Sequence, residues 1–293
     1  MQILMKPSKK DIHFYKKLGI KNYLFSLKDY SVESANYFTI SDIKEIKKRY
    51  PDIHLFISMN KNIVNRELES LKDVLIELDK IGIDAVLFYD QSILSLKEKL
   101  NLKLDLVWAQ THMVTNYNTC NYYYYQNHVK YALLSKEITL EEMIEIKEKS
   151  PIKTIVSLVV TPSVATSKRK LLSNYYQDLG KSPKSQLVIH EKVSGDDYLV
   201  EENKDAVTFY KKGILNGCEV LGELIDHNID YVLLNGDFID SSVFTKAVEN
   251  IANFIEKYED LTEEEKETFI CKQKELLGED TGFFFKKTIY KVK

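Results

Sequence analysis

Residues 80–86 read Lys80-Ile81-Gly82-Ile83-Asp84-Ala85-Val86, and this stretch combines a helix end, a turn residue and the start of a strand. Residues 224–232 repeat the arrangement, with Asn228 in the place of the turn residue. Glycine and asparagine both suit the left-handed backbone conformation that closes a helix. The two stretches therefore predict a fold in which helices lead directly into strands.

Eight short runs rich in β-branched or aromatic residues recur along the chain, most of them at spacings of roughly 20 to 32 residues with helical stretches between. This alternation predicts an α/β protein with a TIM-like (β/α)8 barrel, whose usual size is about 250 residues. A doubly wound open sheet is the alternative that the same alternation permits. The predicted strands are Ile3–Met5, Tyr23–Ser26, His54–Ser58, Ala85–Tyr89, Leu104–Ala109, Val129–Leu134, Thr154–Val160 and Tyr231–Leu234. The predicted helices are Ser41–Arg49, Glu67–Lys80, Leu94–Leu100 and Thr139–Lys149, with Ser41 and Thr139 as N-caps.

The gap between the seventh and eighth predicted strands is longer than the others. It holds a hairpin-like stretch, Gln186–Val200, and a stretch with helical character, Ala206–Lys212. An insertion at about residues 167–228, on the carboxyl-terminal face of a barrel that occupies residues 1–240, is the simplest account. We expect residues 241–293 to form a helical C-terminal extension with a phenylalanine-rich tail that includes Phe283-Phe284-Phe285.

The composition is that of an ordinary soluble globular protein, with 29% charged and 44% hydrophobic residues. A formal charge of −3 excludes a globally basic nucleic-acid binder but leaves room for a local basic patch. The three cysteines, Cys120, Cys218 and Cys271, are odd in number and far apart, so they predict no disulfide framework and a reduced, cytoplasmic protein. No apolar run approaches the ~18 residues of a membrane span, so no membrane association is expected.

Familiar catalytic and metal-binding signatures are absent, and no metal site is predicted. Cys120 is a candidate nucleophile, with a half-buried structural thiol as the alternative. His112 is a candidate general base, although a histidine in such a loop is more often only hydrogen-bonded. The run Tyr122–Tyr125 could stack on bases, but alternately buried and exposed aromatics on a helix or sheet edge are the better interpretation.

Polar side chains gather where the predicted strands end. Loops beyond rigid strands commonly aim donors and acceptors at a ligand, so these positions predict a pocket. Asparagine and aspartate are also common turn residues, and turn chemistry is the alternative for them. The residues predicted to bind substrate are Asn60, Asp90, Gln110, Thr111, Asn116, Glu137, Arg169, Asn174 and Tyr175.

A basic segment stands out in this acidic chain. From Lys168 to Lys192 there are six lysines or arginines against two acidic residues. Such an excess can contact phosphates, so Lys168, Arg169 and Lys170 are predicted to bind nucleic acid. A solvated insertion is the alternative.

Several stretches resemble the peptidase U32 family, the collagenase-like proteases of older nomenclature. They include Ser58-Met59-Asn60, Thr111–Tyr123, Ser135–Glu142, Ser167–Tyr175 and Ile229–Gly236. Residues 115–122 and the ending 280–286 are more specific, and are similar to the short U32 paralogues of Gram-positive bacteria. The resemblance implies a TIM-like barrel and a part in the 5-hydroxylation of wobble uridine in tRNA.

The chain departs from the redox-active members that it resembles. Those members carry a cysteine shortly before the S-x-R-x-L-x-x-N-Y stretch and further cysteines after it, which hold an iron–sulfur cluster. Here Ser163 stands at the first position, and residues 167–212 contain no cysteine. The resemblance therefore implies a chain that binds no cluster itself and acts with tRNA and a longer U32 paralogue. A U32-type peptidase and a non-catalytic binding scaffold are the alternatives.

Overall fold

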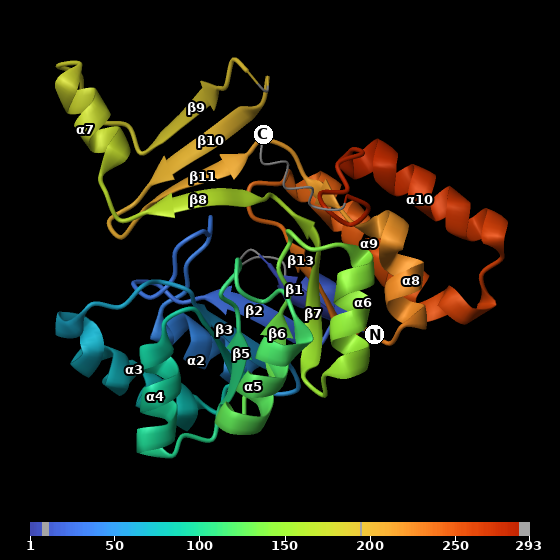
Figure 1. Cartoon of the computed structure of the whole chain (residues 1–293), viewed down its shortest axis with the longest axis horizontal. Helices are drawn as coiled ribbons and strands as arrows, with labels where there is room; N and C mark the ends of the chain where they lie inside the picture. Colours follow the sequence, from blue (N-terminus) through green and yellow to red (C-terminus); the bar gives the residue numbers. More distant parts are fainter. Residues whose placement is uncertain (8–11, 194, 287–293) are drawn as a thin grey trace.

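The computed structural model describes residues 1–7, 12–193 and 195–286. Its main body is a closed barrel of eight parallel strands with helices around it (Figure 1). β13 pairs with both β1 and β7 and so completes the ring. The predicted (β/α)8 barrel is confirmed, and the open-sheet alternative is wrong. The barrel strands are β1 (Gln2–Lys6), β2 (Asn22–Ser26), β3 (His54–Met59), β4 (Ala85–Phe88), β5 (Asp105–Trp108), β6 (Tyr131–Leu133), β7 (Lys153–Val160) and β13 (Tyr231–Asn235).

The helices begin and end largely where local sequence signals place them. Gly82 and Asn228 both have the left-handed conformation, with φ of 74° and 56°, as the two opening stretches predicted. Thr139 caps α6 as predicted, but Thr39 and not Ser41 caps α2, because Thr39 forms a reciprocal capping box with Asp42. The helices are α1 (Ile12–Lys17), α2 (Ile40–Arg49), α3 (Leu68–Ile81), α4 (Gln91–Leu100), α5 (Tyr117–Asn127), α6 (Leu140–Lys149), α7 (Leu171–Asp178), α8 (Leu221–Asp226), α9 (Ser241–Lys257) and α10 (Glu263–Leu277), with single 3-10 turns at Asn65–Glu67, Cys218–Val220 and Tyr258–Asp260.

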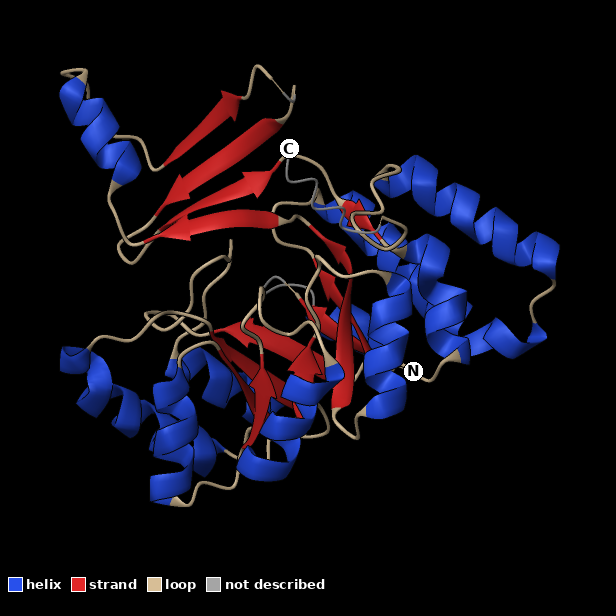
Figure 2. Cartoon of the chain, in the orientation of Figure 1, coloured by secondary structure: helices blue, strands red, loops and turns tan. Residues whose placement is uncertain are grey.

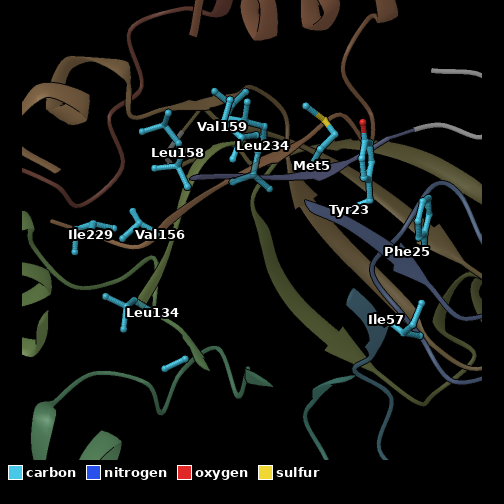
Figure 3. Packing of buried hydrophobic residues seen from close by; sticks show 14 of the residues in the cluster. Met5, Tyr23, Phe25, Ile57, Leu134, Val156, Leu158, Val159, Ile229 and Leu234 are labelled. Carbon is cyan, nitrogen blue, oxygen red and sulfur yellow. The ribbon is translucent and has the colours of Figure 1, made fainter. Parts of the chain in front are cut away.

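The barrel strands alternate between two hydrophobic clusters, because successive side chains of a strand point to opposite faces. On β1, Leu4 packs into the barrel interior, whereas Ile3 and Met5 pack outward against the helices. Figure 3 shows part of the outer cluster, including Met5, Phe25 and Leu234. The interior is filled, so the barrel is a packed core and not a pore.

The tyrosine run belongs to α5, a helix that the sequence interpretation left open as helix or edge. Tyr123 stacks on Trp108, with ring centroids 4.2 Å apart, while Tyr122 and Tyr125 are exposed. The run is thus helical, and its tyrosines are partly buried at Tyr123 and Tyr124 and exposed at Tyr122 and Tyr125.

The insertion between the seventh and eighth barrel strands is a four-stranded antiparallel sheet with α7 at one end (Figure 2). The predicted hairpin in Gln186–Val200 is confirmed. The helix predicted at Ala206–Lys212 is wrong: these residues form β11, because their β-branched and aromatic side chains suit a central strand between β8 and β10. The inserted strands are β8 (Ser163–Ser167), β9 (Gln186–His190), β10 (Asp197–Glu202) and β11 (Val207–Lys211), after which the short β12 (Leu215–Asn216) returns to β7.

The C-terminal extension is helical, as predicted, with α10 packed on α9 beside the barrel (Figure 1). In its tail Phe284 is buried and its carbonyl accepts a hydrogen bond from the backbone N–H of Leu140, whereas Phe283 and Phe285 are exposed. Residues 287–293 of the predicted extension lie outside the described residues.

Within the described ranges, no helix has the length and apolar character needed to cross a membrane.

Candidate functional site

A cavity of about 440 Å³ lies between the mouth of the barrel and the inserted sheet. Its barrel side is built from the carboxyl ends of the strands and the residues just after them, such as Lys6 at the end of β1 and Asn60 after β3. Its other side comes from β8 and from Tyr210 of β11. Ligand sites of (β/α)8 barrels are built at this face, so the cavity is the candidate functional site.

Three aromatic rings close the barrel below the cavity. Phe56, Tyr131 and Tyr231 pack edge to face inside the barrel, with centroids 5.5 to 6.2 Å apart. Desolvation raises the pKa of Tyr131 and of Tyr231, which keeps both phenols neutral. The three rings therefore fill the part of the barrel interior in which they lie.

A buried ion pair forms part of the cavity wall. Lys6 Nζ lies 2.6 Å from Asp237 Oδ2, and the two side chains are only 9% and 5% exposed. Asp237 also accepts hydrogen bonds from the Ser34 hydroxyl and the Asn36 amide. The pair joins the ends of the first and last barrel strands to the loop after β2.

Glu33 ties that loop to the inserted sheet. Its carboxylate accepts hydrogen bonds from the Ser163 and Thr166 hydroxyls, at 3.0 and 2.6 Å. Its φ of 60° is uncommon for a residue with a long side chain, and such conformations persist only where surrounding contacts enforce them. The Ser163 hydroxyl thus helps to hold the inserted sheet against the barrel.

Two further lysines on the cavity wall are also paired. Lys61 Nζ contacts Glu67 and Asp205, at 2.7 and 2.8 Å. Burial by itself would lower the pKa of Lys61, but the two carboxylates together raise it. Lys168 Nζ donates to the backbone carbonyl of Asn62, at 2.7 Å. Both lysines link the inserted sheet to the loop after β3.

Lys136 and Tyr210 differ from these groups. Among the described residues, the Lys136 ammonium has no hydrogen-bond or ion-pair partner, and desolvation lowers its pKa against the opposing effect of Glu33 and Glu137. The buried Tyr210 hydroxyl likewise lacks a partner in the described part of the chain, and burial raises its pKa. Lys136 is only partly buried, but an unpaired buried hydroxyl is costly, so Tyr210 at the cavity indicates a place where a ligand or water binds.

Four of the predicted site residues line the cavity: Asn60, Thr111, Glu137 and Lys168. The Asn60 side chain accepts a hydrogen bond from the backbone N–H of Val32. Glu137 lies 3.1 Å from His112 Nδ1 at the rim, where both side chains are more than half exposed. These residues are the ones that the tertiary structure brings together.

Three predicted residues lie outside the cavity because they serve the local backbone. Asp90 is the N-cap of α4, and Asn116 is the N-cap of α5, so turn and cap chemistry accounts for both. Gln110 accepts a hydrogen bond from Trp108 Nε1 and donates one to the carbonyl of Tyr89.

The remaining predicted residues lie on the insertion, away from the cavity lining. Asn174 and Tyr175 are exposed on α7, and Lys170 Nζ donates to the backbone carbonyl of Asn203. Arg169 is exposed, and its guanidinium has no partner in the part of the chain that the structure describes. The predicted basic patch is therefore partly engaged in internal contacts, and Arg169 is its free member.

The cysteines do not form a catalytic or cluster-binding set. Cys120 lies on α5, Cys218 in the 3-10 turn before α8, and Cys271 on α10. Burial raises the pKa of Cys120 to about 12, which suits the interpretation as a structural thiol. A cluster needs about four thiolates close together, which three cysteines on separate elements do not supply. Within the described ranges, no group of three His, Cys, Asp or Glu side chains is placed to hold a metal ion.

Sequence reasoning missed the most unusual residues of the cavity. Lys6 ends β1 and Asp237 lies two residues beyond β13, which was an available signal, and Lys136 adjoins the predicted Glu137. Glu33 and Tyr210 carried no comparable signal, because one lies in a long loop and the other in a stretch interpreted as a helix.

Comparison with known proteins shows to which family the chain belongs. The sequence model of peptidase family U32 matches residues 15–291. The chain is 24% identical over 288 residues to the tRNA hydroxylation protein P2 of Bacillus subtilis (strain 168), with 93% of each chain covered. Among solved structures, the U32 peptidase Mk0906 matches 55% of this chain and 70% of its own, at 12% identity and a TM-score of 0.46. Thiamine phosphate pyrophosphorylase from Pyrococcus furiosus matches 87% of this chain and 96% of its own, also at 12% identity and a TM-score of 0.46. Since the family match covers nearly the whole length, the chain belongs to peptidase family U32.

Proposed function

We propose that this chain acts in tRNA modification, in the 5-hydroxylation of wobble uridine. The observation that carries the proposal is its similarity to tRNA hydroxylation protein P2 over 93% of both chains. A match of that length extends well beyond the eight barrel strands and includes residues of the inserted sheet. The cavity under that sheet is the place where we expect a small reactant of the modification to bind.

We further propose that the chain binds no iron–sulfur cluster and works as the partner of a longer U32 paralogue. Replacing the C5 hydrogen of uridine by a hydroxyl group oxidises the base, so the reaction needs a redox partner or a hydroxyl donor. The separated cysteines and the engagement of Ser163 with Glu33 support a division of labour in which the longer chain supplies any cluster. This chain would position tRNA or the small reactant.

Deletion of the gene is expected to remove 5-hydroxyuridine from the tRNA of the host strain, wholly or in large part. Mass spectrometry of tRNA nucleosides measures the change directly, and re-expression of the wild-type chain should restore the nucleoside. Unchanged 5-hydroxyuridine in the deletion strain, with any longer U32 gene also deleted, would refute the proposed function.

The partner is tested separately. A tagged chain expressed at its natural level should copurify the longer U32 protein and tRNA. If neither the longer U32 protein nor tRNA copurifies while the deletion abolishes 5-hydroxyuridine, the proposed partnership is wrong and the role in tRNA modification still stands.

Arg169→Gln is expected to weaken tRNA binding and to reduce the slope of log affinity against log salt by somewhat less than about one unit, as for one lost phosphate contact. Arg169 is the residue to change because it is exposed and its guanidinium is free among the described residues, whereas Lys168 and Lys170 hold backbone carbonyls. Neutralising all three would therefore alter the inserted sheet as well as the charge. Filter binding at several salt concentrations measures the slope.

Arg49→Gln is the matched control for this change. Arg49 ends α2 and precedes β3, so it lies at the amino-terminal end of the barrel, opposite the cavity. The control should leave the salt slope unchanged. Equal slopes for wild type and Arg169→Gln would remove Arg169 from the tRNA-binding surface.

The peptidase alternative has less support. None of the three cysteines lines the cavity, and burial keeps the Cys120 and Cys218 thiols protonated by raising the pKa of each. Stoichiometric labelling by a protease-directed electrophile would favour a peptidase over the proposed function. Binding of tRNA without any change of 5-hydroxyuridine on deletion would favour a non-catalytic scaffold.

A further inference from the structure

The inserted sheet has a hydrophobic cluster of its own. Among the described residues, this cluster shares no member with the two clusters of the barrel. Two layers that pack separately can move relative to one another when the contacts between them are few and polar. The members of the inserted cluster are Leu172 of α7, Leu187 and Ile189 of β9, Val200 of β10, and Val207 and Phe209 of β11.

Two short connections join this sheet to the barrel, and they lie side by side. Residues 161–162 connect β7 to β8, and residues 212–214 connect β11 to β12. The backbone N–H of Lys211 donates to the carbonyl of Pro162, at 2.9 Å, and so links the two connections. Gly213 has a φ of 132°, which residues with a side chain rarely adopt. Adjacent connections of this kind can act as a hinge, because a few torsions suffice to turn the sheet.

The opposite end of the sheet meets the barrel through ion pairs. Lys204, in the turn between β10 and β11, pairs with Asp29 of the loop after β2. Its neighbour Asp205 lies 2.8 Å from Lys61, in the loop after β3. Polar contacts at an edge that water reaches can be exchanged for contacts with water, unlike a packed hydrophobic interface.

The other contacts between sheet and barrel are compatible with a hinge at residues 161–162 and 212–214. The rings of Tyr210 and Phe238 lie 4.5 Å apart between centroids. Tyr210 pairs with Ser163 at the start of β8, so this contact lies close to the hinge, where a rotation displaces atoms least. Farther from the hinge, Thr166 donates a hydrogen bond to Glu33, which is again a polar contact.

We propose that the inserted sheet, together with α7, is a lid that turns about these two connections and is latched by the pair of Asp205 with Lys61. Figure 1 shows the sheet over the mouth of the barrel, which is the latched form. Opening would give a ligand access to the cavity between sheet and barrel, and closing would exclude water from it. This device goes beyond the proposed tRNA function and does not depend on it.

Asp205→Asn weakens the latch without leaving a buried charge unpaired. Lys61 Nζ also lies 2.7 Å from Glu67, so its ammonium keeps one carboxylate partner in this variant. Glu67→Gln is the matched control. It removes the other carboxylate from the same lysine, but Glu67 belongs to the barrel side, so the contact between lid and barrel stays.

The test measures how fast a thiol inside the cavity reacts. Ser58→Cys places it on β3, where Ser58 is buried and lines the cavity, and Cys271→Ser removes the exposed native thiol. The reagent is a maleimide on a neutral polyethylene glycol chain too large for the closed cavity. We expect Asp205→Asn to raise the labelling rate at position 58 about fivefold, as for the loss of one modest ion pair. Glu67→Gln should leave the rate close to that of the background chain.

Cys120 reports on global unfolding in the same samples, because it is buried on α5 and does not line the cavity. Its protection should be the same in every variant. Equal acceleration at position 58 by both substitutions, or no acceleration by Asp205→Asn, would overturn the proposal. So would rapid labelling of position 58 in the background chain, or a rise in Cys120 labelling that matches the rise at position 58.

Discussion

Asp237→Ala is expected to lower the free energy of unfolding by about 3–5 kcal/mol, because it leaves the Lys6 ammonium buried without its partner. The two side chains are 5% and 9% exposed, so water cannot replace the lost carboxylate without opening the cavity wall. Urea unfolding followed by the fluorescence of Trp108, the sole tryptophan, measures the loss.

The double variant Lys6→Met with Asp237→Leu is the control for this prediction. It removes both charges and keeps a similar volume, and buried ion pairs replaced in this way often lose little stability. We therefore expect it to recover most of the loss. A loss below about 1 kcal/mol in the single variant would mean that the pair is as weak as an exposed one.

Trp108→Ala is expected to cost about 3–5 kcal/mol of stability, the range for removing a large buried aromatic side chain. The ring is fully buried and stacks on Tyr123, so truncation leaves a void between β5 and α5. Circular dichroism during urea unfolding measures the effect, since the fluorescent residue itself is removed.

Trp108→Phe separates packing from hydrogen bonding. It keeps an aromatic ring against Tyr123 but removes the N–H group that donates to Gln110, so a smaller loss of about 1–3 kcal/mol is expected. Equal losses in the two variants would show that the hydrogen bond, and not the packed ring, contributes most. Gln110 would then be important for holding the loops after β4 and β5, although it does not line the cavity.

The candidate site was only partly predictable from the sequence. Of the polar residues selected because they follow barrel strands, Asn60, Thr111 and Glu137 line the cavity. Asp90 and Asn116 were selected in the same way but do not line it, because they cap the helices that follow. Spacing along the chain does not distinguish these two uses of one side chain.

The barrel fold could be predicted from local sequence patterns. Each strand is a short, largely apolar run, and left-handed residues such as Gly82 and Asn228 mark the ends of some helices shortly before the next strand. These signals need only neighbouring residues, so they could be recognised without the folded structure. Helix α5 and strand β11 were less clear, because aromatic residues fit a helix surface and a strand equally well.

The contacts that shape the cavity wall depend on tertiary structure. Ser34 and Asp237 are 203 residues apart, and Glu33 meets Thr166 across 133 residues, yet both contacts shape the same wall. Whether a lysine becomes paired, like Lys6, or stays without a partner among the described residues, like Lys136, depends on which distant carboxylates the fold brings within reach. The residue type is identical in both cases, and only the fold decides which neighbours each lysine meets.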